Sequence, residues 1–93
     1  MGIIVRGLIG VMTARFHAVI RPLKTLGERI RSARKAKGWT QEVLAEEANI
    51  DRSYIGGVER GTRNLTFTVL CEICKALKCD VAAITKGIPD LPK

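Results

Sequence analysis

Aromatic residues are scarce in this chain. Phe, Trp and Tyr make up only 4% of its 93 residues, whereas hydrophobic residues as a whole make up 46%. A core built mainly from Leu, Ile, Val and Ala is more usual for packed helices than for sheets. A chain of this length supports one small core, which argues against a multi-domain arrangement. The composition therefore favours a single all-α domain.

Histidine is nearly absent as well. His17 is the one histidine, and the sequence has no clustered carboxylates and no nucleophile beside a base. A catalytic site needs such a constellation of titratable groups. We therefore expect no enzymatic activity and no cofactor. The domain also offers no room for a sizeable ligand pocket, so we expect no small-molecule ligand.

Cysteine is limited to one short segment. Cys71, Cys74 and Cys79 are odd in number and lack the spacing of a disulfide framework, which argues against a secreted scaffold and favours a reducing cytoplasm. Cys71 and Cys74 form a C-x-x-C motif, but no second pair follows and His17 lies far upstream. We therefore expect no metal site. Cys74 falls on an apolar helical stripe and is interpreted as a small core residue.

Acidic residues are missing from the first 24 positions, and no apolar run is long enough to cross a bilayer. The run "GIIVRGLIGVM" is interrupted by Arg6, Gly7 and Gly10, and no convincing cleavage site for a secretory signal follows it. Three interpretations stay open: an ordered extension that packs on the domain or on a second copy, an unstructured tail, or upstream sequence before a true start at Met12. We favour the first, because a bare apolar segment promotes aggregation.

The chain carries an excess of positive charge. Sixteen Lys and Arg residues against nine Asp and Glu residues give a formal net charge of +7. Such an excess favours a polyanionic partner, either nucleic acid or an anionic membrane surface. The charge alone does not distinguish the two. A membrane-surface binder would use the basic, apolar residues 1–24 as its contact segment.

From residue 25 onward the sequence predicts five short helices. Thr25 and Glu28 form a capping box for a first helix that ends near Lys37, with Gly38 as its left-handed cap. The caps of the other four are predicted at Thr40, Asp51, Thr66 and Asp80. The predicted domain covers residues 25–88, between an extension of uncertain structure over residues 1–24 and a tail over residues 89–93.

The segment that starts at Gln41 has the pattern of a helix-turn-helix unit. Such a unit needs a small residue where its two helices cross, and Ala45 is there. It needs a turn residue that tolerates a positive φ, and Asn49 is the best choice after glycine. It also needs apolar residues where the helices meet each other and a third helix. These places hold Leu44, Ala48, Ile50, Ile55 and Val58.

Two stretches, "TQEVLAEEA" and "YIGGVERGTRN", form a specific pair of signatures. Because it contains both stretches, the segment over residues 25–88 resembles the DNA-binding domain of the phage repressor and Cro family (XRE family) of helix-turn-helix regulators. Within that family "DRSYIGGVERGTRN" is most similar to the controller proteins of restriction-modification systems. The resemblance implies a five-helix, lambda-repressor-like fold and does not cover residues 1–24. Lys78 departs from it, because glycine commonly ends the fourth helix.

The helix after Asp51 carries the predicted contact face. At about 100° per residue, Ile55 and Val58 point to the core, while the opposite side carries Arg52, Ser53, Gly56, Gly57 and Arg60. The first outward residues of a recognition helix lie nearest the base edges of the major groove. We therefore expect Arg52 to contact guanine O6 and N7 and Ser53 to reach a base or a phosphate. The alternative for Arg52 is a solvated arginine at a helix start.

The rest of this surface has less specific interpretations. Gly57 is interpreted as a gap that lets DNA approach the helix closely, whereas DNA approach and tight helix packing both stay open for Gly56. Tyr54 either contacts a phosphate or sugar or packs as a partly buried residue. Phosphate contacts are expected from the helix ends and the following loop, where an ordinary polar turn is the alternative. The residues concerned are Gln41, Arg60, Arg63 and Asn64.

Glu59 is an acidic residue on a helix that is expected to face a polyanion. It follows Val58 on the inner flank of that helix. The resemblance places Arg34 of the first helix opposite Glu59 in a partly buried ion pair. Glu59 is therefore expected to stabilise the fold.

The leading hypothesis is a cytoplasmic, nucleoid-associated transcriptional regulator that binds double-stranded DNA. It acts as a homodimer on a palindromic operator, since one domain makes few base contacts, and its dimer surface is predicted to include Val81, Ile84 and Ile88. The alternative is a protein-interaction module of the same fold, antitoxin- or adaptor-like, which Arg52 and Arg60 disfavour. We expect no membrane partner.

Overall fold

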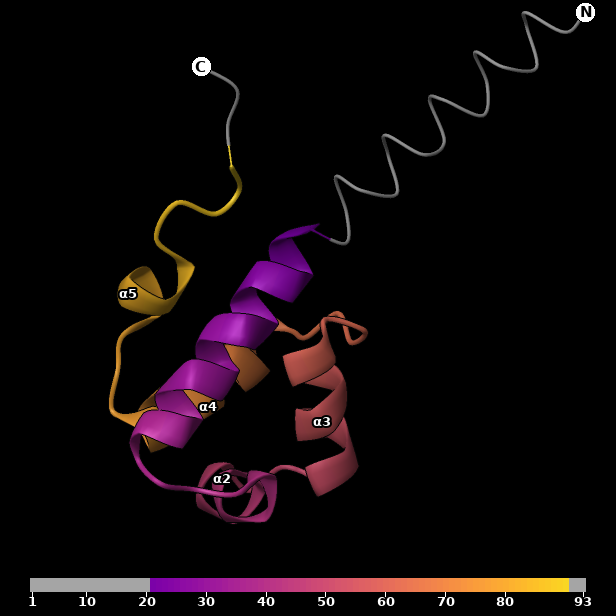
Figure 1. Cartoon of the computed structure of the whole chain (residues 1–93), viewed down its shortest axis with the longest axis vertical. Coiled ribbons are helices and arrows are strands. Elements are labelled where there is room, and N and C mark those ends of the chain that lie inside the picture. Colours follow the sequence, from indigo (N-terminus) through magenta and orange to yellow (C-terminus); the bar gives the residue numbers. More distant parts are fainter. Residues whose placement is uncertain (1–20, 91–93) are drawn as a thin grey trace, which may run out of the picture.

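A computed structural model describes residues 21–90, and within this range the chain forms five helices and no strand. The first helix covers residues 21–36 and carries no label in Figure 1. It is followed by α2 (Gln41–Ala48), α3 (Arg52–Arg60), α4 (Phe67–Leu77) and α5 (Val81–Thr85). The predicted all-α, five-helix fold is confirmed. The extension was predicted over residues 1–24; residues 1–20, on which most of that prediction and the start at Met12 fall, lie outside the described range.

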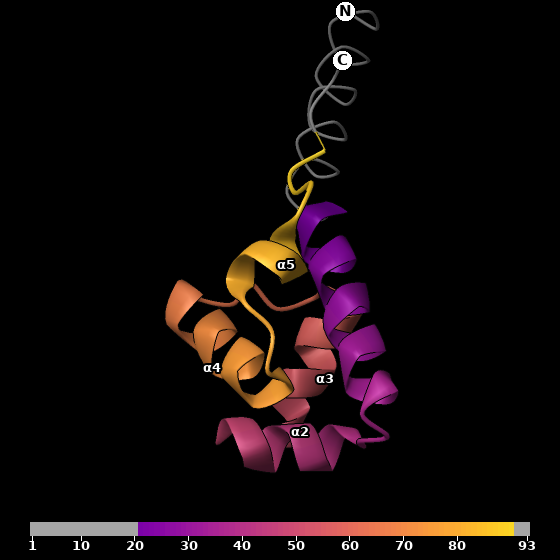
Figure 2. The same cartoon turned by 90° about the vertical axis from the view of Figure 1, so that its left-hand side faces the viewer.

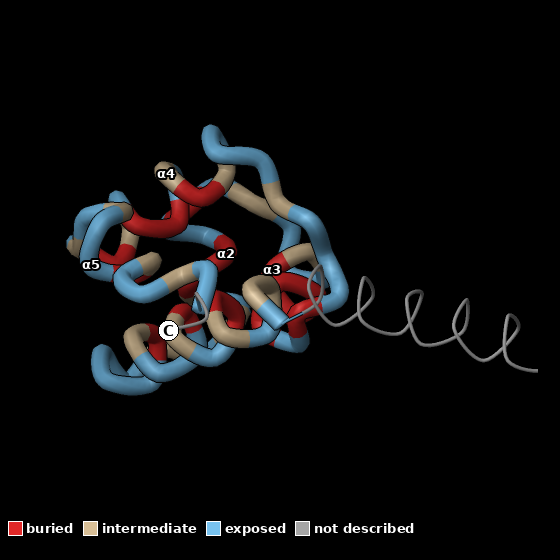
Figure 3. The backbone as a smooth tube through the Cα atoms, turned by 90° about the horizontal axis from the view of Figure 1, so that it is seen from above, coloured by how far each residue is buried: buried red, intermediate tan, exposed pale blue. Residues whose placement is uncertain are grey.

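The helices surround one apolar core. α2 lies across one end of the domain, and α5 lies beside the first helix in both views (Figures 1 and 2). Buried segments of the helices face one another, and most of the loop residues are exposed (Figure 3). The core consists of Leu26, Ile30, Leu44, Ala45, Ala48, Ile55, Val58, Leu70, Ile73, Cys74, Leu77 and Ile84. The apolar positions of the helix-turn-helix pattern therefore have the role predicted for them, with Ile50 packed at the margin.

Side-chain caps begin four of the helices at the predicted residues. Each cap oxygen accepts a hydrogen bond from a free backbone N–H of the first turn, which satisfies a group that has no partner inside the helix. The N–O distance is 3.2 Å at Thr40, Asp51 and Thr66, and 2.6 Å at Asp80. These local patterns fix where α2 to α5 start.

Left-handed residues end the first four helices. Gly38 has a φ of 72°, as its predicted capping role requires, Gly61 ends α3 with a φ of 75°, and Asn49 has φ 55° at the turn between α2 and α3. Lys78, the departure from the family pattern, also adopts φ 57° and closes α4. A lysine in this region costs about 1–2 kcal/mol relative to the right-handed conformation. The fourth helix thus keeps its expected ending without a glycine.

The predicted capping box at Thr25 is wrong. Residues 21–36 are all helical, so Thr25 lies inside the helix. Its hydroxyl donates to the carbonyl of Arg21, 3.0 Å away, which is a common arrangement for a threonine within a helix. The helix therefore extends into the range predicted as the extension. The pattern with Glu28 fits a cap, but the preceding residues are compatible with helix as well.

α3 packs against the first helix through an unusually close backbone contact. A methyl group at Gly27 would lie 2.3 Å from the carbonyl oxygen of Val58 and 2.7 Å from that of Glu59. No side chain fits there without separating the two helices, because the neighbours are backbone atoms. Gly27 was not identified from the sequence, although it sets how near α3 lies to the rest of the domain.

A buried ion pair joins the same two helices. Arg34 donates from Nε to Oε2 of Glu59 at 2.7 Å and from Nη2 to Oε1 at 2.9 Å. Gln41 adds a bond from Nε2 to Oε1 of Glu59 at 3.1 Å, and Arg34 Nη1 donates to the carbonyl of Trp39 at 2.7 Å. The hydrogen bond to Glu59 raises the pKa of Arg34. The pairing that the resemblance implied for Arg34 and Glu59 is confirmed.

An arginine of the first helix holds the end of α5. Nη1 of Arg29 donates to the carbonyls of Ile84 at 3.0 Å and Lys86 at 2.6 Å, and so satisfies groups that the short helix leaves open. Ile84 is only 6% exposed and belongs to the core of its own chain. Its predicted place in a dimer surface is therefore corrected, whereas Val81 and Ile88 remain half-buried.

Replacing Gly27 tests the close contact. Gly27→Ala should lower the free energy of unfolding by about 2–3 kcal/mol, because the clash with backbone outweighs the gain in helix propensity, which is about 1 kcal/mol. Chemical denaturation measures the change. Ser32→Ala, at an exposed site of the same helix, is the control and should have little effect. An equal or higher stability of Gly27→Ala would contradict the contact.

Removing one partner tests the buried pair. Glu59→Ala should lower the free energy of unfolding by about 3–5 kcal/mol, because it leaves the charge of Arg34 buried and unpaired. Thermal and urea unfolding check this, with Glu47→Ala on the exposed side of α2 as the control. Unfolding curves that coincide for Glu59→Ala and the wild type would show that the pair does not stabilise the fold.

Candidate nucleic-acid interface

α3 separates a core side from an exposed side, as its sequence predicts. Ile55 and Val58 are 0% and 2% exposed, whereas Arg52, Ser53 and Arg60 are exposed. Tyr54 is half-buried and packs against the core. Tyr54 therefore has the partly buried packing role that the sequence left open. Its contact with DNA remains a prediction.

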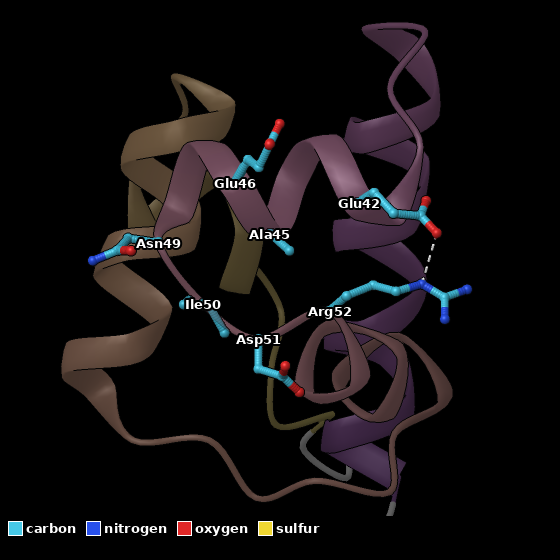
Figure 4. A pocket seen from close by; sticks show the side chains of 7 residues that line it. All are labelled: Glu42, Ala45, Glu46, Asn49, Ile50, Asp51 and Arg52. Atoms are coloured by element: carbon cyan, nitrogen blue, oxygen red, sulfur yellow. Dashed lines mark ion pairs between the residues drawn. The ribbon is translucent and has the colours of Figure 1, made fainter.

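Arg52 begins the exposed side and lies in the first turn of α3. The helix macrodipole disfavours a positive charge at this end, so the position does not serve helix stability. Nε of Arg52 lies 2.9 Å from Oε1 of Glu42 on α2, and both side chains are more than half exposed (Figure 4). A hydrogen bond from the backbone N–H of Glu42 to its own carboxylate is the main reason why the pKa of Glu42 is lowered, and the positive charge of Arg52 lowers it further. The sequence did not indicate this pair, since nothing local connects positions 42 and 52.

Ser53 is engaged by the cap of its own helix. Its hydroxyl donates to the carboxylate of Asp51, which also accepts the backbone N–H of Ser53 at 3.2 Å. The hydroxyl hydrogen bond is the main reason why the pKa of Asp51 is lowered. In this state the Ser53 oxygen is available as an acceptor, because its proton points to Asp51.

Gly56 and Gly57 are not bare, which corrects the gap predicted at Gly57. Both residues are buried. A methyl group at Gly57 would lie 2.5 Å from Cγ of Arg63, and one at Gly56 would lie 3.1 Å from Nη1 of Arg60 and 3.5 Å from Oε1 of Gln41. Long polar side chains therefore fold across the space that the glycines leave.

The loop after α3 directs Arg63 back over the helix. The N–H and the hydroxyl of Thr62 both donate to the carbonyl of Gly57, at 2.9 and 3.1 Å. The guanidinium carbon of Arg63 lies 5.5 Å from the centre of the Tyr54 ring, within the range of a cation–π contact. Asn64, the next loop residue, is exposed.

Gln41 connects the candidate surface to the buried pair. It is the first residue of α2, and its Nε2 donates to Glu59. This hydrogen bond braces α2 against α3, and the phosphate contact of Gln41 remains a prediction. Arg60 extends from the last turn of α3 at the rim of the same surface.

An open groove of about 630 Å³ lies between α2 and the start of α3 (Figure 4). Its ionisable lining residues are three acids and one base, namely Glu42, Glu46, Asp51 and Arg52. Carboxylates repel a phosphate backbone, so the groove limits the basic surface on this side. Arg52 lies at the boundary between the two.

The cysteines belong to α4 and to the turn that follows it. Cys74 is 2% exposed, which confirms its predicted place in the core, and burial raises the pKa of its thiol to about 12. Cys71 and Cys79 are half-buried and free. Within residues 21–90, none of the helices has the length and apolarity needed to cross a membrane.

The chain is similar to several known regulators. It is 45% identical over 56 residues to control protein C.SmaI of Serratia marcescens, which covers 60% of this chain and 67% of that protein. It is 42% identical over 60 residues to the immunity repressor protein of Bacillus phage phi105, which covers 64% of this chain. The chain spans only 42% of that repressor's length.

A solved structure has the same fold as the described helices. The restriction-modification controller protein C.Esp1396I, crystallised as a tetramer with its natural 35-base-pair operator, aligns with a TM-score of 0.64 at 41% identity. The alignment covers 68% of this chain and 83% of that one. The model of the HTH_3 family, described as helix-turn-helix, matches residues 30–84, which is more than half of the sequence. The chain therefore belongs to the HTH_3 helix-turn-helix family.

Proposed function

We propose that this protein is a sequence-specific transcriptional regulator that binds double-stranded DNA with α3 in the major groove. One observation carries the proposal: α3 presents arginine from its first turn on the exposed side of a helix-turn-helix unit, where the charge does not stabilise the helix. The operator complex of C.Esp1396I supports it through a shared fold. The similarity to a control protein and to part of an immunity repressor points the same way.

Arg52 and Ser53 are the proposed base-reading residues of α3. A bidentate contact from arginine to guanine is worth about 1–3 kcal/mol of discrimination. The pair between Arg52 and Glu42 is exposed, and exposed ion pairs contribute little to stability. Arg52 can therefore leave Glu42 for a guanine at a small cost. Ser53 acts as an acceptor while Asp51 holds its proton, which suits a base amino group.

A second set of groups is proposed to hold the phosphate backbone. Gln41 and the free N–H groups at the start of α2 form an anion-binding helix end. Arg60 and Asn64 lie at the other end of α3, and the Tyr54 hydroxyl lies at its edge. Contacts of this kind position a protein on DNA without reading its sequence. They place α3 so that its first turn meets base edges.

A homodimer on a two-fold-related operator follows from the small size of the surface. One domain offers few base-reading side chains, whereas two copies on half-sites about 34 Å apart multiply the specificity. The proposed contact points are two half-buried residues, Val81 at the start of α5 and Ile88 after its end. The crystallised complex of C.Esp1396I contains a tetramer with its operator, which supports assembly on DNA in this family.

Selection of bound fragments from random double-stranded DNA tests the function. The full chain should enrich a two-fold-symmetric motif whose half-sites are centred about one helical turn apart. Binding should be measured at a fixed salt concentration, because phosphate contacts make affinity salt-dependent. Recovery of fragments without a common motif would contradict sequence-specific binding, even if the protein retained DNA.

Arg52→Ala should relax the preference for one base pair in each half-site by about 1–3 kcal/mol. Competition binding with operators changed at single positions measures this. Arg31→Ala removes the same charge from an exposed site on the first helix and should leave the preference intact. If both variants weaken all operators equally, Arg52 does not read a base.

A further inference from the structure

Arg63 belongs to the loop, yet its side chain lies on α3. The loop begins with Thr62, whose two hydrogen bonds to the carbonyl of Gly57 turn the chain back toward the helix. The next residue, Arg63, is therefore directed over the helix surface. An arginine extending freely from the loop would meet the sugar-phosphate backbone, whereas this one lies on the side of α3 proposed to face the bases.

Gly57 provides the space for the stem of Arg63. A methyl group at Gly57 would lie 2.5 Å from Cγ, 3.4 Å from Nε and 3.5 Å from Cδ of Arg63. The first distance is shorter than carbon atoms tolerate, so any larger residue must displace the arginine. Gly57 lies within a regular helix, and its carbonyl accepts the loop hydrogen bonds. Because Gly57 has no side chain, the stem of Arg63 can lie directly against α3.

Tyr54 receives the charged end of Arg63. The guanidinium carbon lies 5.5 Å from the centre of the ring. Tyr54 belongs to the first turn of α3, one turn before Gly57. The positive charge of Arg63 is also one of the lesser influences that lower the pKa of Asp51, after the hydrogen bond from Ser53. The stem therefore runs from the end of α3 toward its start, and the charge lies near the N-terminal end.

We propose that Arg63 is a second base-reading residue, held across α3 by a slot that Gly57 and Tyr54 form. The proposal rests on the function proposed above and changes the predicted role of Arg63, which was a phosphate contact. The N-terminal end of a recognition helix is the part nearest the base edges, and arginine is well suited to guanine. Contact with Tyr54 restricts the side chain before DNA binds, which reduces the entropy lost on binding.

The proposal predicts that Gly57→Ala and Arg63→Ala have the same effect on specificity. Each should reduce the discrimination between operators that differ at one base pair per half-site by about 5- to 150-fold. The double variant should lose no more than either single variant, because both changes remove the same contact. Competition binding on singly substituted operators measures all three, and the affected base pair should differ from the one that depends on Arg52.

Two variants serve as matched controls. Gly56→Ala adds the same methyl group on the neighbouring residue, where it meets only the ends of Arg60 and Gln41, so the preference at the Arg63 base pair should persist. Tyr54→Phe keeps the ring and should retain that preference, whereas Tyr54→Leu should reduce it. Thermal melts accompany each variant, and Gly57→Ala should be at least as stable as the wild type because alanine favours helix.

A measurement on the free protein separates this inference from the function itself. Stacking on Tyr54 should shift the Nε–H resonance of Arg63 in the NMR spectrum, and Gly57→Ala should abolish the shift while Gly56→Ala retains it. Wild-type protein without any preferred DNA sequence would contradict the proposed function, whatever the spectrum shows. A wild-type preference that Arg63→Ala weakens uniformly at all operators would overturn the base-reading role and identify a phosphate contact instead.

Discussion

The buried contact between α3 and the first helix is the constraint on which the candidate surface depends. Gly27 lets the two backbones meet, and the bonds from Arg34 to Glu59 fix how α3 is rotated within that contact. Gln41 joins the same carboxylate from the start of α2. A buried charge left without its partner is costly, so few other arrangements of these helices are stable. The orientation of the exposed side of α3 is therefore set by the interactions of its buried side.

The two adjacent glycines of α3 are explained by what lies over them. Each glycine costs about 1 kcal/mol of helix propensity relative to alanine, and neither leaves the helix open to solvent. Arg63 fills the space at Gly57, while Arg60 and Gln41 lie over Gly56. The absence of side chains at both positions lets long polar side chains from α2, from the end of α3 and from the following loop cover its surface. The resulting surface is basic, and the acidic groove beside α2 limits it.

Local features were predictable from the sequence, and contacts between distant residues were not. The caps at Thr40 and Asp51 and the left-handed Asn49 follow from side-chain chemistry within a few residues. The cap predicted at Thr25 was wrong because the prediction relied on a local pattern, which does not show whether the residues before Thr25 are helical. The pairing of Arg34 with Glu59 came from the family resemblance. The close contact at Gly27 and the return of Arg63 onto α3 depend on tertiary packing, which no spacing in the sequence indicates.

The central claim is that α3 meets DNA in the major groove. Methylation interference on the selected operator tests it most directly, because guanine N7 lies in the major groove and adenine N3 lies in the minor groove. We expect methylation of specific guanines in each half-site to block the wild-type protein, and this interference to be lost at one guanine per half-site with Arg52→Ala. Interference confined to adenine N3, or a guanine pattern that Arg52→Ala leaves unchanged, would contradict the account.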